Sequence, residues 1–159
     1  MRMKNPRMAA LALLLCASAA ACGENQGRAA ARQLARRNSC IAAELALDAK
    51  ERLASLDTAV VASQGTPLEQ ATVASHVFVT AYKAWADASS RSLDFADSAS
   101  YARSRQDSVR LAQMAEQARP KAVPAGTVEA NAAKSYDADF TRAFGNPDHP
   151  CNKPTQADD

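Results

Sequence analysis

The chain has 159 residues, of which 47% are hydrophobic but only 5% are aromatic, and its formal net charge is +2. Alanine is the commonest residue by a wide margin. This composition excludes a collagen-like polymer, a dense disulfide scaffold and a strongly basic nucleic-acid binder, and the length suits one modest domain.

The first 21 residues have the composition of an export signal. Arg2, Lys4 and Arg7 form a basic start, residues 8–16 are an apolar run, and residues 17–21 are small. This layout is typical of a bacterial secretory signal peptide, so we expect residues 1–21 to be removed. They hold three basic and no acidic residues, so their loss would change the net charge from +2 to −1. A chain of that charge has no general attraction to nucleic acid.

Cys22 stands directly after this segment, in the sequence Ala19-Ala20-Ala21-Cys22-Gly23. This sequence resembles the lipobox of bacterial lipoproteins, although Ala19 occupies a position where Leu is common. The resemblance implies acylation of the Cys22 thiol and cleavage just before it. With Gly23 rather than Asp next, it also implies transport to an outer membrane. The alternative is simple cleavage to a soluble periplasmic or secreted protein.

Residues 22–38 are expected to form the tether between this lipid anchor and the folded domain. Arg28, Arg32 and Arg36 recur every four residues, so they share one face if the segment is helical. That face would either contact anionic lipid head groups or form a solvated extension of the first helix.

The two remaining cysteines, Cys40 and Cys151, form an even pair in an exported chain, which favours a disulfide. Two free thiols and a metal site are the alternatives. A metal site would need Cys151 to be reduced and could recruit His149, two residues before it.

Two amphipathic helices are predicted before residue 91. The first runs from about Cys40 to Ser63, with Ser39 as its cap and a stop near Gln64-Gly65. The second begins at Thr66-Pro67-Leu68-Glu69, a capping-box pattern with a proline in the first turn. Their apolar stripes alternate spacings of three and four: Ala42, Ala46, Ala49, Leu53, Leu56 and Val60 in the first, and Ala71, Ala74, Phe78, Ala81, Trp85 and Ala88 in the second.

Two further helices are predicted after a turn near residues 91–97, where Ser and Asp are frequent. The third ends near Ala118, before two prolines, and the fourth runs from about Thr127 to Gly145. The rival interpretation is one long helix over residues 67–118.

The expected fold is therefore all-α: a small antiparallel bundle of four helices, or three as the alternative, within residues 39–151 and stapled by the disulfide. An even number of up-and-down helices would bring Cys40 and Cys151 to the same end. Residues 152–159 are expected to form a disordered acidic tail.

Familiar catalytic motifs are missing from the sequence, including the G-x-S-x-G elbow, the P-loop and H-E-x-x-H. His76 is predicted to be a surface histidine, and Asp94, Asp97 and Asp107 are predicted to be caps or solvated charges. We therefore expect no enzyme activity, cofactor or metal.

The function expected from these features is that of an envelope lipoprotein, anchored in the outer membrane and facing the periplasm. It would act as a helical interaction or structural module for an envelope protein partner. The alternative is a soluble secreted bundle that binds a small ligand or metal between its helices.

Overall fold

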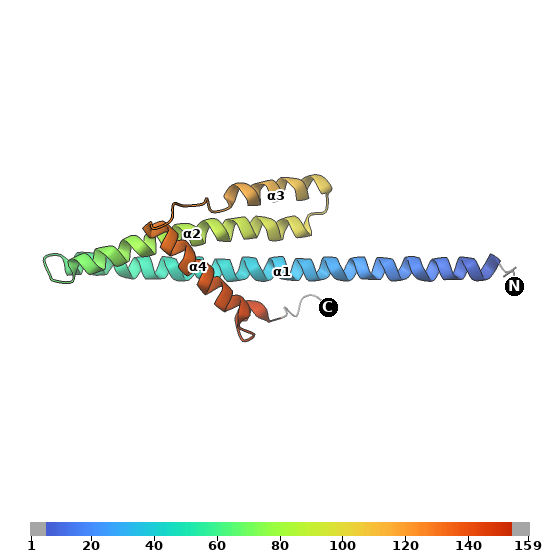
Figure 1. Cartoon of the computed structure of the whole chain (residues 1–159), viewed down its shortest axis with the longest axis horizontal. Helices are drawn as coiled ribbons and strands as arrows, with labels where there is room; N and C mark the ends of the chain where they lie inside the picture. The colour runs from blue at the N-terminus through green and yellow to red at the C-terminus, as the bar shows by residue number, and fades with distance from the viewer. Residues whose placement is uncertain (1–5, 154–159) are drawn as a thin grey trace. The chain divides into compact units, whose positions relative to one another are not determined.

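The computed structural model describes the backbone of residues 6–153 and the side chains of residues 26–153. This part of the chain contains four α-helices, one short 3-10 helix and no strand (Figure 1). The elements are α1 (Pro6–Ser63), α2 (Glu69–Tyr101), α3 (Arg105–Ala118), α4 (Val128–Gly145) and η1 (Pro150–Asn152).

The predicted all-α bundle with one disulfide is confirmed. The predicted signal peptide, residues 1–21, and the predicted lipid site, Cys22, lie outside the residues whose side chains are described.

Contacts between residues divide the chain into two units, Met1–Leu34 and Ala35–Asp159, and the helical bundle is the second unit. The prediction that the first helix begins at about Cys40, with Ser39 as its cap, was wrong. α1 runs continuously through this position, so the backbone of Ser39 is bonded within the helix and the residue does not act as a cap. No helix in the described part of the chain is both long and apolar enough to cross a membrane.

The first turn of the bundle joins α1 to α2, which run antiparallel within the second unit (Figure 1). The predicted stop at Gln64-Gly65 is confirmed, because Gly65 has a φ of 72° and lies in the left-handed region that glycine adopts without strain. The predicted capping box at Thr66-Pro67-Leu68-Glu69 does not form, because Leu68 and not Thr66 stands at the N-cap of α2. α2 begins only at Glu69, whose carboxylate accepts a hydrogen bond of 2.8 Å from the Gly65 N–H.

The turn predicted at residues 91–97 was wrong, and so was the alternative of one helix over residues 67–118. α2 continues to Tyr101, and the break lies at residues 102–104. Ser104 decides its position, because its hydroxyl oxygen accepts from the Asp107 N–H at 3.0 Å and caps α3. The Ser92 hydroxyl instead donates to the Ala115 carbonyl at 2.8 Å and joins α2 to α3.

The fourth helix begins and ends where the sequence predicts. The Thr127 hydroxyl caps it by accepting from the Ala130 N–H at 3.1 Å, and the helix ends at Gly145. α4 crosses α2 obliquely instead of running up and down beside it (Figure 1). The two cysteines therefore do not meet because four helices alternate up and down, which is the reason that the sequence suggests; they meet because α4 crosses the bundle and carries Cys151 back to α1.

The core lies where α1, α2 and α4 meet. Its buried members are Ala49, Tyr82, Ala86, Ala132 and Tyr136, and Phe78, Trp85 and Phe140 pack against them while partly exposed. The stripe predicted for α2 was therefore only partly right, because Phe78, Ala81 and Trp85 pack against the core but the buried positions lie one residue later. Ala71 and Ala74 are exposed, while Tyr82, Ala86 and Ser89 are buried. The reason is α4, whose Tyr136 ring packs edge-on against Tyr82 with 6.0 Å between the ring centroids.

Candidate functional site

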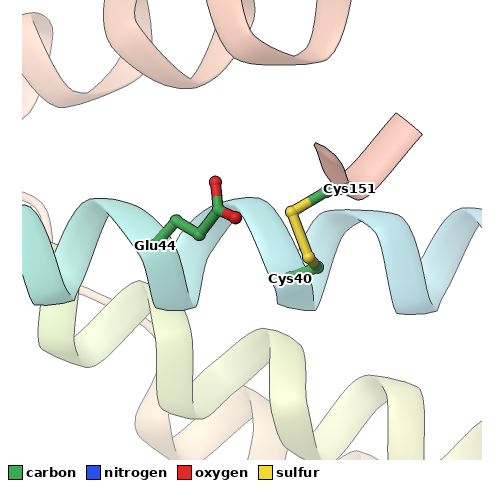
Figure 2. A group of neighbouring side chains, drawn as sticks. All are labelled: Cys40, Glu44 and Cys151. Carbon is green, nitrogen blue, oxygen red and sulfur yellow. A yellow bond between two sulfur atoms is a disulfide. The ribbon is translucent and has the colours of Figure 1, made fainter. Parts of the chain in front are cut away.

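The predicted disulfide joins Cys40 of α1 to Cys151 of η1, with an S–S distance of 2.09 Å and a Cα–Cα distance of 5.7 Å (Figure 2). It links positions 111 residues apart in the sequence. Both cysteines are partly buried. The bond therefore ties the segment after α4 to the first helix of the bundle.

His149 and Glu44 lie beside this bond. Figure 2 shows Glu44 one turn after Cys40 on the same helix. Its carboxylate is 3.2 Å from His149 Nε2, and His149 Nδ1 accepts from the Cys151 N–H at 3.3 Å. Because Nδ1 accepts, Nε2 carries the ring proton and donates to Glu44. His149 is therefore used to hold the C-terminal segment in place.

Arg37 makes a second set of contacts to the same segment. Its guanidinium lies over the Phe144 ring, 3.8 Å from the centroid, and donates to the Phe144 carbonyl and to the Asn152 side chain. The Asn152 amide in turn donates to the Ala143 carbonyl at 2.9 Å. These bonds satisfy carbonyl groups that the end of α4 leaves free. Arg37 lies within residues 22–38, which the sequence predicts to be a tether, because nothing in an Ala/Arg run distinguishes this arginine from its neighbours.

The ligand atoms of Cys40, Glu44 and Cys151 lie within 4.8 Å of one another, which is the spacing of a metal-binding group. Both sulfur atoms are committed to the disulfide. Thiolates, not disulfide sulfurs, are the strong metal ligands. In the oxidised state of the protein this cluster is therefore a structural cross-link.

A cleft of about 410 Å³ lies between α1, α2, α4 and the segment that follows α3. Asn38 and Ser89 line it together with Leu93, Tyr136 and Phe140. Tyr136 is only 4% exposed, and burial raises its pKa to about 12, against an opposing effect of the Ser89 hydroxyl. Despite that proximity, the Tyr136 hydroxyl has no hydrogen bond of acceptable geometry to any described residue.

A second, smaller cleft of about 280 Å³ contains a fully bonded polar group. The Tyr82 hydroxyl donates to Asp139 Oδ2 at 3.0 Å, and Arg142 pairs with the other oxygen of Asp139 at 3.1 Å. Burial, followed by the bond to Asp139, raises the pKa of Tyr82. Tyr82, Asp139 and Arg142 therefore each have a polar partner, and their bonds link α2 to α4.

The histidine and aspartates that the sequence predicts to be surface or capping residues do not line either cleft. His76 is not simply a surface histidine, because its Nε2 is 2.7 Å from Asp57 Oδ1 and links α2 to α1. Asp107 belongs to the cap of α3, where the Ser104 hydroxyl donates to its carboxylate at 2.7 Å. Asp97 is partly buried on α2, and burial raises its pKa.

No family model matches this chain, and neither a curated protein nor a solved structure matches it significantly.

Proposed function

We propose that this protein is a lipid-anchored helical module of a bacterial cell envelope, without enzyme activity, which is held on the outer membrane through Cys22 and faces the periplasm. It binds another envelope protein through its folded bundle. The observation that carries the proposal is the combination of an N-terminal segment with the composition of an export signal, a lipobox-like Cys22 and a separate helical unit from Ala35 onward.

The Cys40–Cys151 disulfide supports the export part of the proposal. Disulfides persist in the periplasm and outside the cell, whereas the cytosol keeps thiols reduced. Acyl chains on Cys22 would then keep the exported chain on a membrane, since each buried methylene contributes about 0.8 kcal/mol.

The interaction part is supported by the turn end of the α1–α2 hairpin. Val61, Leu68, Val73 and Val77 are all exposed there, and Leu68 is 68% exposed. Exposed apolar surface is where proteins make contact with one another, and these four side chains lie in this turn or on the two helices that it joins. We assign the contact with the envelope partner to this end of the bundle.

Metabolic labelling with an alkyne analogue of palmitate tests the anchor. The wild-type chain is expected to be labelled and to fractionate with membranes, and Cys22→Ala is expected to lose both properties. Cys16→Ala is the matched control, because it removes a cysteine of the predicted signal peptide and leaves the lipobox intact. An unlabelled wild-type chain in the soluble fraction would contradict the proposal and favour the soluble secreted alternative.

A further inference from the structure

Four side chains of metal-ligand type meet where the segment after α4 returns to α1. Cys40 and Glu44 lie one turn apart on α1, while His149 and Cys151 belong to the returning segment. The ligand atoms of Cys40, Glu44 and Cys151 lie within 4.8 Å of one another (Figure 2). His149 Nε2 adds a fourth ligand atom, 3.2 Å from the Glu44 carboxylate. Thiolate sulfur, imidazole nitrogen and carboxylate oxygen are the donor types that bind zinc in proteins.

The spacing of these atoms suits a tetrahedral zinc ion. Zinc bonds to nitrogen and oxygen are about 2.0–2.2 Å long, so two such ligands lie roughly 3.3–3.6 Å apart on one tetrahedron. The 3.2 Å between His149 and Glu44 is close to this separation. Two thiolates on the same ion lie about 3.8 Å apart, since the Zn–S bond is about 2.3 Å long. The Cα atoms of Cys40 and Cys151 are 5.7 Å apart, so side-chain rotation reaches this separation once the disulfide is reduced.

The oxidation state of the two cysteines decides whether the site exists. Thiolates are strong zinc ligands, whereas the sulfurs of a disulfide are not. Both cysteines are partly exposed, so a thiol reductant can reach the bond. A dithiol reductant gives the disulfide two electrons and two protons, and itself becomes a disulfide. Zinc then replaces the two thiol protons.

Other contacts hold the ligands together when the disulfide opens. Arg37 of α1 donates to the Phe144 carbonyl and to the Asn152 side chain, on both sides of His149. The side chain of Glu44 is 46% exposed and that of His149 only 18%, so an ion can enter from the side of Glu44. Zinc at Nε2 moves the ring proton of His149 to Nδ1, and only the 3.3 Å bond from the N–H of residue 151 is lost.

We propose that the reduced protein binds one zinc ion through Cys40, Glu44, His149 and Cys151, and that oxidation to the disulfide releases it. In the release step a disulfide oxidant accepts two electrons from the two zinc-bound sulfurs and leaves as two thiolates. The sulfurs form the cross-link, and the zinc ion departs with its charge unchanged. This redox-controlled site is independent of the lipid anchor and of the hairpin end.

Cobalt(II) is a suitable probe, because it occupies tetrahedral zinc sites and its thiolate complexes absorb visible and near-ultraviolet light. The full chain is used with Cys16→Ala and Cys22→Ala, so that Cys40 and Cys151 are its only cysteines. It is reduced with a phosphine, which offers no competing thiolate. Titration should then give one cobalt per chain, intense tetrahedral bands and a sulfur-to-cobalt charge-transfer band, and zinc should displace the cobalt. The oxidised chain should show none of these bands.

His149→Ala and Glu44→Gln distinguish this site from a simple pair of thiols, because both variants keep the two cysteines. Each should weaken zinc binding to the reduced chain by at least about tenfold, the lower end of the effect of removing even a supporting residue of a metal site. His76→Ala and Glu51→Gln are the matched controls, since neither residue belongs to this cluster, and both should leave the affinity unchanged.

Three results would overturn the proposal. The first is the absence of the cobalt bands from the reduced chain. The second is an unchanged zinc affinity in either His149→Ala or Glu44→Gln, which would leave that residue outside the coordination of the metal. The third is loss of the helical circular dichroism spectrum on reduction without metal, because the fold would then no longer hold the four ligands together.

Discussion

Asp97 shows how a single carboxylate opposes the stability of this fold. The residue is partly buried on α2, and its Oδ1 has no hydrogen-bond partner among residues 26–153. Burial raises its pKa above the usual value of 3.8, and Asp94 raises it further, while Arg36 of α1 acts in the opposite direction. Because the folded state binds this proton more tightly than the unfolded state, Asp97 contributes most to stability below pH 3.8. That contribution is lost as the pH rises through the higher pKa of the folded state.

Asp97→Asn should therefore raise the melting temperature at pH 7, because the amide carries no charge that burial penalises. The variant should also lose the part of the pH dependence that Asp97 causes. Melting curves between pH 3 and pH 8 check both effects. Glu51→Gln, on an exposed acid of α1, is the matched control and should change little. A lower melting temperature for Asp97→Asn at pH 7 would mean that attraction to Arg36 outweighs the cost of burial.

Individual residues could be predicted from the sequence where their own chemistry decides their role. They could not be predicted where the role depends on which residues of another helix they contact. The Cys40–Cys151 pair followed from the number of cysteines and the predicted compartment. Arg37 and Tyr82 were missed, because their roles depend on which face of α4 reaches them. That information is absent from the periodicity of α1 or α2 alone.

Helix packing in the core depends on alanine. Ala49, Ala86 and Ala132 come from α1, α2 and α4, belong to the same core cluster and are fully buried. A side chain of one methyl group lets helix backbones approach closely, and leaves no room for a larger residue. The alanine-rich composition therefore has a packing role in the three-helix contact.

Ala86→Leu should destabilise the bundle by about 1–3 kcal/mol, the usual cost of overpacking a dense core. Ala84→Leu is the matched control, since Ala84 is exposed two residues earlier on α2 and its substitution should change stability by less than about 0.5 kcal/mol. Urea unfolding followed by circular dichroism measures both. Equal effects of the two substitutions would contradict the packing of α2 against α1 and α4.

Helix boundaries were predictable where one residue type decides them and unpredictable where several compete. Gly65, Thr127 and Gly145 end or begin helices as the sequence indicates. The break between α2 and α3 was placed too early, because serine and aspartate occur throughout residues 89–108. Only at Ser104 does the cap form, while Ser92 is bonded to α3 across the hairpin.

The molecule as a whole combines a thin core with a long covalent loop. Ile41 is the largest side chain that is completely buried among the described residues. Alanine burial contributes less than the roughly 1.5–3 kcal/mol of a buried Leu or Phe. The disulfide, with a separation of 111 residues, offsets this by restricting the unfolded chain.

Replacing both cysteines, Cys40→Ser with Cys151→Ser, should lower the free energy of unfolding by about 2–5 kcal/mol. The helical circular dichroism spectrum should persist, because Arg37 and His149 still hold the C-terminal segment. Urea denaturation of the oxidised wild type, the reduced wild type and the double variant measures the effect. The last two should unfold at similar midpoints, below that of the oxidised protein. An unchanged midpoint would show that the cross-link is dispensable.

The class of fold followed from the sequence, but the arrangement of α4 and the cleft beside it did not. Periodic stripes and turn residues are local features, and they indicate four helices and their order. The oblique crossing of α4 depends on how Tyr136 and Phe140 pack against α2, which is a long-range contact. The cleft between Asn38, Ser89 and Tyr136 exists only because of that crossing.

The most direct test of the account is the intact mass of the protein extracted from its native membrane without a reductant. A lipid-anchored, disulfide-linked protein is expected to start at Cys22, to be heavier than its amino acids by the mass of its acyl groups, and to gain the mass of two hydrogen atoms on reduction. An unacylated chain, or a mass that does not change on reduction, would contradict it.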